Sequence, residues 1–234
     1  MHLFYAPKVE SNTHILSEEE SKHAIRVLRL KKHDTVILVN GKGLWCEAVI
    51  EEDAPKKCVL TITQTSTQQS ERDFKLVVAV APTKNSARME WFLEKATEIG
   101  IDEVIPLISD HGERTKIKPE RWEKVLVSAM KQSLKAYLPI LSEPLKLEQI
   151  VSKFSDAHHY LAHCREGEKK HLLRLKPTKQ TVVIYIGPEG DFSTREVGLA
   201  DSHKMSPISL GEARLRTETA ALAACHIANL WKHV

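Results

Sequence analysis

One stretch near the end of the chain most restricts how the chain can fold. The apolar run at residues 182–186 ends abruptly in Gly187-Pro188-Glu189-Gly190. A second interruption, Leu210-Gly211, follows the short apolar patch at 207–209. A buried strand that ends in a glycine loop places backbone N–H groups at its carboxyl end, where open α/β sheets bind ligands. The two loops therefore predict either one small-molecule site or two ordinary turns between strands and helices.

Read together, the two loops match a known pattern. The sequences IGPEG at 186–190 and LGEARLRTETA at 210–220 resemble, in order and spacing, the ribosomal RNA small-subunit methyltransferase E family. That family belongs to the SPOUT class and methylates N3 of a uridine in 16S ribosomal RNA, with S-adenosylmethionine as cofactor. The resemblance implies that both loops form a trefoil-knotted cofactor site, an exception to the rule that chains avoid knots.

The composition sets only broad limits. With 234 residues the chain can form one large domain or two modest ones, and its net charge of +3 is weak evidence for a nucleic-acid partner. No apolar run is long enough to span a bilayer, and the first residues lack the features of a signal peptide. The four cysteines form no CxxC pair, which argues against a zinc knuckle and a disulfide framework. We therefore expect a cytoplasmic protein with free thiols and no membrane partner.

The first seventy residues are typical of a small β-structure. Apolar runs predict strands at 2–6, 35–39, 44–50 and 58–62, and Asn40-Gly41-Lys42-Gly43 predicts a hairpin. Small β-barrels are a frequent scaffold for RNA binding. The residues His23, Val27-Leu28-Arg29, Asp34 and Gly41 also match the PUA-like N-terminal domain of the family. Because residues 63–73 are polar and typical of a linker, we expect a PUA-like RNA-binding β-barrel domain at 1–72.

The rest of the chain predicts a second, α/β domain at 73–234. Residues 74–81 are almost continuously apolar, as in a parallel strand that is buried on both faces. Asn85 can cap a helix that Gly100 ends, and further strands are expected at 104–108 and 159–162. A helix is expected from Pro119 to about Ala136. This alternation predicts a mainly parallel sheet covered by helices, to which the resemblance adds the SPOUT trefoil knot.

Basic residues in both domains are candidates for RNA contact. Arg26 and Arg29 belong either to the solvated face of a helix or to an RNA-binding surface. The resemblance places the segment around Lys131 and Gln132 near the RNA. Lys135 stands where many family members have arginine, so the planar fork that clamps phosphate is missing there. The full set of predicted RNA-binding residues is Arg26, Arg29, Lys84, Arg88, Arg114, Lys131, Gln132 and Lys135.

A group of histidines could suggest a metal site. His158, His159, His163, Cys164 and His171 lie close together in the sequence. However, neighbouring residues of a strand point to opposite faces, and no carboxylate is placed to complete a coordination shell. We therefore expect no metal.

The expected chemistry assigns roles to the terminal loops. Uridine N3 carries a proton at neutral pH, so the site should supply either a base or a cation that stabilises the resulting anion. Arg216 is the candidate cation. Glu189 is either the candidate base or a side chain that holds the loop together. Glu218 can likewise be interpreted as a carboxylate of the first helical turn, stabilised by the helix terminus. The predicted cofactor-binding residues are Ile186, Gly187, Pro188, Glu189, Gly190, Leu210, Gly211, Leu215 and Thr217.

Two departures from the family pattern affect these loops. Asp191 follows Gly190 where family members often have a second glycine, and a positive φ there costs aspartate more than glycine. Ala213 stands where many members have arginine. The first departure concerns the detailed backbone of the loop rather than its role.

Three functions remain open from the sequence. The first is methylation of uridine N3 in 16S ribosomal RNA, within the small ribosomal subunit. The second is a SPOUT methyltransferase that acts on another base or on a ribose 2′-hydroxyl, and the third is a non-catalytic RNA-binding assembly factor. The helix from Leu215 to about Trp231 is apolar on more than one face, which together with the family's dimer predicts a homodimer.

Overall fold

The computed structural model describes residues 1–9, 12–69, 72–112 and 117–233. The chain divides into two compact units. One unit consists of residues 1–71 together with 130–138, and the other of residues 72–129 together with 139–234. The predicted Arg114 lies outside the described residues. Within the described residues, no helix is both long enough and apolar enough to cross a membrane.

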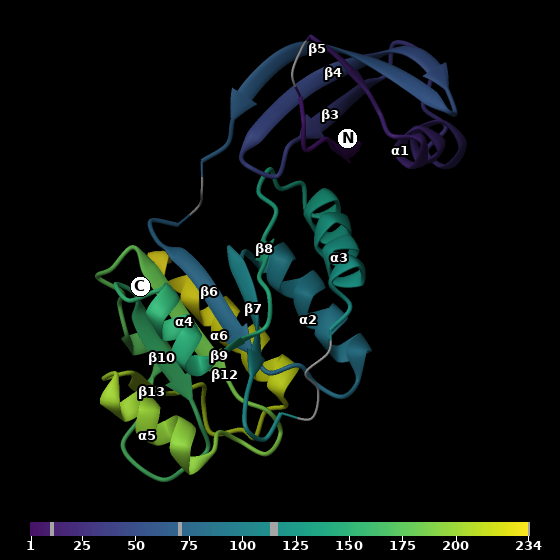
Figure 1. The fold of residues 1–234 in the computed structure, drawn as a ribbon. Coiled ribbons are helices and arrows are strands. Elements are labelled where there is room, and N and C mark those ends of the chain that lie inside the picture. The colour runs from purple at the N-terminus through teal and green to yellow at the C-terminus, as the bar shows by residue number, and fades with distance from the viewer. Residues whose placement is uncertain (10–11, 70–71, 113–116, 234) are drawn as a thin grey trace. The chain divides into compact units, whose positions relative to one another are not determined.

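The first unit is built on a five-stranded sheet in the order β1-β3-β4-β5-β2. β1 pairs with β3 in parallel, and the other pairs are antiparallel. Two register shifts between β4 and β5 let these long strands bend around the core, which is the curvature visible in Figure 1. The strands are β1 (Leu3–Tyr5), β2 (Thr13–Ile15), β3 (Thr35–Val39), β4 (Leu44–Ala54) and β5 (Lys57–Thr67). A short helix, α1 (Glu18–Lys22), continues into the π-helical turn η1 (His23–Val27).

Local signals specify the turn and the helix start in this unit. The Asn40 side chain accepts hydrogen bonds from the backbone N–H groups of Lys42, at 2.8 Å, and Leu44, at 3.1 Å. Gly41 and Gly43 have φ of 75° and 96°, a region that glycine enters without steric cost. The predicted hairpin is therefore confirmed. Ser17 caps α1 by accepting a hydrogen bond from the N–H of Glu20.

The predicted linker begins too early. Residues 63–67 belong to β5, where residues 64–67 pair with residues of β4. They are polar because all five are exposed on this end of the strand. A strand with little apolar burial has the same composition as a loop, so the sequence pattern could not separate the two.

Residues 130–138 belong to the first unit although they are distant in sequence from residues 1–71. Helix α3 (Pro119–Gln132) ends before Ala136, the predicted end, because Leu134 has a left-handed φ of 54°. Met130 and Ala136 are buried against Leu3, Ile37 and Val39. The predicted division of the chain at 72/73 did not include this returning segment.

The second unit is an α/β layer structure. Its strands follow the order β11-β13-β10-β12-β6-β7-β8, with β9 beside β7, and all pairs are parallel. This confirms the predicted mainly parallel sheet. The strands are β6 (Lys75–Val80), β7 (Glu103–Ile108), β8 (Ile140–Leu141), β9 (Leu145–Lys146), β10 (His158–Ala162), β11 (Lys170–His171), β12 (Thr181–Ile186) and β13 (Ser206–Ser209). The helices are α2 (Ser86–Ile99), α3, α4 (Leu147–Lys153), α5 (Thr194–Ser202) and α6 (Thr217–Leu230), with short 3₁₀ turns η2 (Leu172–Arg174) and η3 (Trp231–His233).

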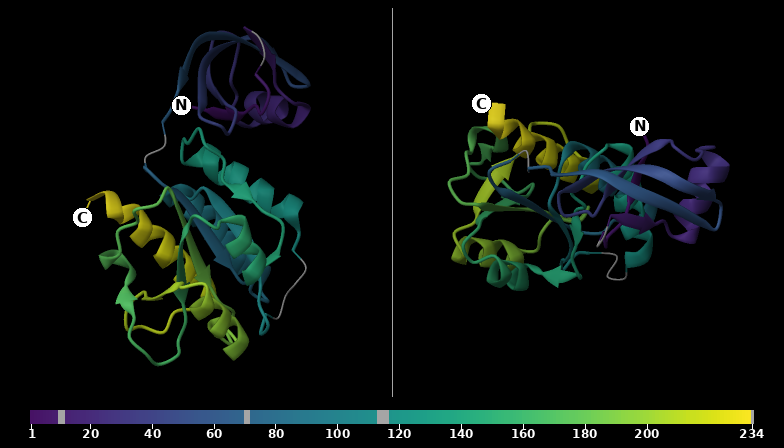
Figure 2. Two further views of the ribbon diagram at one scale, coloured as in Figure 1. Left: turned by 60° about the vertical axis from the view of Figure 1, so that its left-hand side comes forward. Right: turned by 90° about the horizontal axis from the view of Figure 1, so that it is seen from above.

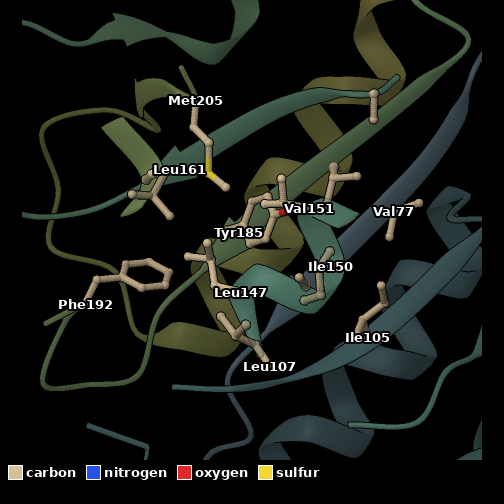
Figure 3. Close-up of a cluster of buried hydrophobic side chains, with 14 residues drawn as sticks. Val77, Ile105, Leu107, Leu147, Ile150, Val151, Leu161, Tyr185, Phe192 and Met205 are labelled. Atoms are coloured by element: carbon tan, nitrogen blue, oxygen red, sulfur yellow. The ribbon is translucent and has the colours of Figure 1, made fainter. Parts of the chain in front are cut away.

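Helices cover both faces of this sheet (Figures 1 and 2). On one face, residues of α4 and α5 join the strands in a cluster that includes Leu161, Tyr185 and Phe192 (Figure 3). On the other face, α6 packs against α2 and against β6 and β12. Burial on both faces explains why β6 and β12 are continuous apolar runs.

The last fifty residues follow an unusual path through the unit. The chain leaves β12, forms α5 on one face, and adds β13 on the far side of β10. It then returns to the opposite face as α6. The trefoil knot that the family resemblance implies is expected at this return.

Candidate active site

A cavity of about 1200 Å³ lies at the carboxyl ends of β10, β12 and β13. Three segments line it: residues from 162–169 after β10, residues 186–191 after β12, and residues 208–217 leading into α6. Arg88 of α2 and Ala220 of α6 complete the wall. All of these residues belong to the second unit. The position agrees with the general rule for ligand sites in parallel α/β sheets.

The structure brings the predicted cofactor and catalytic residues together. Both predicted catalytic side chains, Arg216 and Glu189, line the cavity. Arg88, which was predicted to contact RNA, also lines it. The predicted cofactor-binding residues all lie along the same wall: Ile186, Gly187, Pro188, Glu189, Gly190, Leu210, Gly211, Leu215 and Thr217.

Neighbouring side chains and hydrogen bonds fix the first loop, residues 186–191. A methyl group on Gly187 would lie 2.9 Å from the buried ring of Phe192, so only glycine fits without movement. Asp191 has the expected positive φ, at 59°, and its carboxylate accepts a hydrogen bond of 3.1 Å from the N–H of Cys164. His111 Nδ1 lies 3.2 Å and 3.0 Å from the carbonyl oxygens of Gly190 and Asp191. Because a carbonyl oxygen only accepts, this nitrogen must carry the proton.

A buried hydrogen bond joins the two loops. Thr217, buried in the first turn of α6, donates a hydrogen bond of 3.1 Å to the carbonyl oxygen of Gly187. Gly211 has a φ of 121°, which a side chain rarely permits, and turns the second loop around the cavity. The two sequence motifs are therefore parts of one structure.

Two carboxylates share one guanidinium at the edge of the cavity. Arg88 Nη1 lies 3.0 Å from Glu189 Oε1, and Arg88 Nε lies 3.7 Å from Glu218 Oε1. The Glu189 side chain is 63% exposed, whereas that of Glu218 is only 8% exposed. Within the described residues, Glu218 Oε2 is buried without a hydrogen-bond partner. The ion pair with Arg88 supports the interpretation that Glu189 ties its loop in place, and the N-terminus of α6 stabilises the charge of Glu218.

Arg216 is placed differently from these groups. It occupies the N-cap position of α6 with an extended backbone, and its side chain makes no capping hydrogen bond. The residue is exposed and lines the cavity. Its guanidinium is therefore available to a ligand that enters from solvent.

The other predicted RNA-binding residues are distributed over both units. Lys84 is exposed in the loop before α2. Arg26, Arg29, Gln132 and Lys135 belong to the first unit, and among them Arg26, Arg29 and Gln132 are exposed.

Lys131 has a structural role in the first unit. Its ammonium binds both carboxylate oxygens of Glu20, at 2.6 and 2.9 Å, and lies 5.6 Å from the ring centroid of Phe4. The Lys131 side chain is only 19% exposed. These contacts join the end of α3 to α1.

The sequence interpretation missed the cavity wall after β10. His163, Cys164, Gly167 and Lys169 all line the cavity. The Lys169 ammonium donates to the carbonyl oxygens of His163 and Arg165, at 2.9 and 2.5 Å, and so closes this loop. Burial lowers the pKa of His163, which therefore stays neutral near physiological pH. The sequence did offer one signal, the predicted strand at 159–162. Because the carboxyl ends of neighbouring parallel strands lie at one edge of the sheet, the residues after this strand could have been expected near the other two loops.

The cavity fits a nucleoside-sized cofactor. Ile186, Leu210 and Leu215 provide apolar surface, and the loops around them provide peptide N–H and C=O groups that can read a base and a ribose. Typical small-molecule pockets measure roughly 300–1,000 Å³. The volume of about 1200 Å³ belongs to a cavity that is open to solvent, and it is ample for such a cofactor.

Comparisons with known proteins agree with this geometry. A family model of an RNA methyltransferase domain matches residues 64–229, and a model of an RNA methyltransferase PUA domain matches residues 16–63. The ribosomal RNA small subunit methyltransferase E of Aquifex aeolicus is 29% identical over 97% of this chain and 98% of its own length. The relative with the same name from Rickettsia conorii is 30% identical over 92% of this chain and 88% of its length.

Solved structures give the same result. A probable rRNA methyltransferase from Porphyromonas gingivalis superposes with a TM-score of 0.92 and 38% identity, over 100% of this chain and 99% of that one. The ribosomal RNA small subunit methyltransferase E of Neisseria gonorrhoeae, solved with S-adenosyl methionine, gives a TM-score of 0.88 and 25% identity, over 100% and 98%. The chain therefore belongs to the ribosomal RNA small subunit methyltransferase E family and is an RNA methyltransferase.

Proposed function

We propose that this protein transfers a methyl group from S-adenosylmethionine to N3 of a uridine in 16S ribosomal RNA, within the small ribosomal subunit. The observation that carries the proposal is the cavity in which both motif loops meet, joined by the hydrogen bond from Thr217 to Gly187. The names of the relatives support the small-subunit RNA as substrate. The cofactor bound in the Neisseria gonorrhoeae structure supports the choice of methyl donor.

The walls of the cavity suit the task of positioning. S-adenosylmethionine supplies an electrophilic methyl group on a sulfonium, so methyl transfer needs mainly an attacking atom held in line. Gly187 lets the first loop lie directly against the buried ring of Phe192, because a methyl group there would be 2.9 Å from the ring.

The proton on uridine N3 must leave before that nitrogen can attack. We assign Arg216 the role of stabilising the negative charge that then spreads over O2, N3 and O4 of the uracil. Its exposed position on the cavity wall supports this role. Glu189 is the candidate base only if it separates from Arg88; while the ion pair persists, it holds the loop.

The chemical outcome can be tested directly. Ribosomal RNA from cells that lack the protein should lose N3-methyluridine, and expression of the protein should restore it. Because a methyl group on N3 blocks the pairing edge, reverse transcriptase should stop one nucleotide before the site. A stop that appears only at low nucleotide concentration would indicate a ribose methyl group instead. Failure of the protein to bind S-adenosylmethionine in calorimetry would indicate a non-catalytic assembly factor.

We further propose a division of labour in which the domain of residues 1–72 binds RNA and residues 73–234 carry out methylation. The match of a PUA domain model to residues 16–63 and the exposed Arg26 and Arg29 support the first part. The cavity, which lies wholly in the second unit, supports the second part. Four cysteines without disulfides agree with a protein of the cytoplasm, where small-subunit RNA is made.

We also propose that the protein is a homodimer through α6. Ala221, Ala224 and Ala228 are buried, whereas Leu222 and Ile227 on the outer side are only partly covered. A second copy would cover them. Sedimentation is expected to give a dimer at micromolar concentration, and Leu222→Asp should shift it to a monomer because a carboxylate is costly to bury. Lys176→Asp, outside the helix, should leave the dimer intact; a monomeric wild type would contradict the proposal.

A further inference from the structure

A second cavity of about 420 Å³ opens on the opposite edge of the same sheet. It lies at the amino ends of β10 and β13, between the residues that follow α4 and those that follow α5. β10 runs from this cavity, at His158, to the candidate active site, at Ala162. Because a strand rises by roughly 3.3 Å per residue, the two cavities lie about 13 Å apart along β10. The second cavity is therefore a separate site.

The side chains around this second cavity are mostly cationic or hydrogen-bond donors. Its wall includes Lys179 and Lys204, the histidines His158, His159 and His203, and three serines. Among the described residues that line it there is no carboxylate. We propose that this histidine–lysine cavity binds a phosphate group, either of an RNA backbone or of a free nucleotide.

Two lysines bring ammonium protons to the cavity that no other described group takes up. The His158 ring is held elsewhere, because it accepts a hydrogen bond of 3.1 Å from the N–H of Thr178 and stacks on Tyr160. Within the described residues, Lys204 forms no ion pair and its ammonium makes no hydrogen bond. Lys179 donates to the carbonyl oxygen of Ala157 at 3.2 Å, which leaves two of its three protons.

His159 forms the rigid back wall of the cavity. Its Nε2 donates to the carbonyl oxygen of Phe154 at 3.0 Å, and its Nδ1 accepts from the hydroxyl of Tyr185 at 2.8 Å. Tyr185 is fully buried in the core of the second unit. Burial lowers the pKa of His159, and the nearby Lys179, His203 and His158 lower it further. The ring is therefore neutral, and it fixes the cavity rather than adding charge.

This set of groups favours an anion over a metal ion. Ammonium groups repel cations, and the described residues contain no cluster of histidine, cysteine and carboxylate side chains that could hold a metal. A phosphate offers charge and several acceptor oxygens to lysine, histidine and serine donors. The neighbouring carboxylates Asp156 and Asp201 are exposed and outside the lining, so they weaken the positive potential without occupying the site.

The turn that ends α5 places Lys204 at the cavity. Its φ of 54° is the left-handed conformation that commonly ends a helix, and the N–H of Met205 donates to the carbonyl oxygen of Ala200 across this turn. The turn that imposes this conformation also brings Lys204 to the mouth of the cavity beside His203.

Calorimetry of the full-length protein with inorganic phosphate and pyrophosphate tests the proposal. The double variant Lys179→Gln/Lys204→Gln should weaken binding by at least about tenfold, because charge-assisted hydrogen bonds are lost. The matched control Lys176→Gln, an exposed lysine outside the cavity, should bind within about twofold of wild type. Unchanged circular dichroism and unchanged S-adenosylmethionine affinity would show that the double variant is folded. No binding by wild type, or equal binding by the double variant, would overturn the proposal.

Two further arms identify the ligand. Displacement of phosphate by a nucleoside 5′-monophosphate alone would assign a free nucleotide. Displacement by a short single-stranded oligoribonucleotide at lower concentration would assign the RNA backbone. If neither displaces phosphate, the inferred site is wrong.

Discussion

Arg216→Lys is expected to keep S-adenosylmethionine affinity but to lose about 10²–10³ in turnover, the usual effect of removing a donor that stabilises charge in the transition state. Lysine keeps the positive charge and loses the planar fork that can hold a uracil oxygen. Raising the pH should partly restore turnover, because hydroxide can then remove the N3 proton that the site no longer helps to release. Single-turnover kinetics with saturating RNA and calorimetry with the cofactor measure the two effects separately.

A matched variant separates this role from a general effect of charge. Arg174→Lys changes an exposed arginine in η2, outside the cavity, and should leave turnover unchanged. If Arg216 only grips a phosphate, its variant will need more RNA but reach nearly normal turnover at saturation. Wild-type turnover by Arg216→Lys at neutral pH would show that the assigned role is wrong.

Phe192→Ala should lower the free energy of unfolding by about 3–5 kcal/mol, as truncation of a buried aromatic side chain does elsewhere. The ring is 1% exposed and packs within the cluster shown in Figure 3. It also lies directly behind Gly187, so its loss should loosen the cofactor loop and weaken S-adenosylmethionine binding. Urea unfolding and calorimetry measure the two consequences. Phe154→Ala, at a partly exposed position, should cost less stability.

The contact between Gly187 and Phe192 allows a sharper test. Gly187→Ala alone should impair cofactor binding, because its methyl group would lie 2.9 Å from the ring. Gly187→Ala combined with Phe192→Leu should bind better than Gly187→Ala alone, since the smaller side chain gives the methyl group space. Additive losses in the double variant would show that the ring does not position the loop.

Much of the second unit could be predicted from local signals. The strands β6 and β12 are buried on both faces, so their sequences are almost purely apolar and easy to identify. Asn85 and Gly100 mark the two ends of α2, where the structure finds the predicted cap and the predicted end. The two motif loops identified the cavity because both contribute backbone to it.

The remaining features depend on contacts between distant residues. Arg88 and Glu218 are 130 positions apart, and no periodicity relates them. The wall after β10 has no glycine motif like the other two, so its place in the cavity became visible only with the sheet order. Asp191 is an intermediate case. Its positive φ could be expected from the position of a family glycine, whereas its hydrogen bond to Cys164 could not.

The late contribution of residues 130–138 to the first unit has a consequence for biosynthesis. During synthesis, the apolar surface around Leu3, Ile37 and Val39 leaves the ribosome before Met130 and Ala136, the residues that cover it in the folded protein. Until then the N-terminal unit lacks part of its core, although domains usually fold in order of synthesis. We expect the nascent chain to expose this apolar surface until residues 130–138 have left the ribosome. A protein that modifies ribosomal RNA thus depends on translation of more than half its length before its first domain is complete.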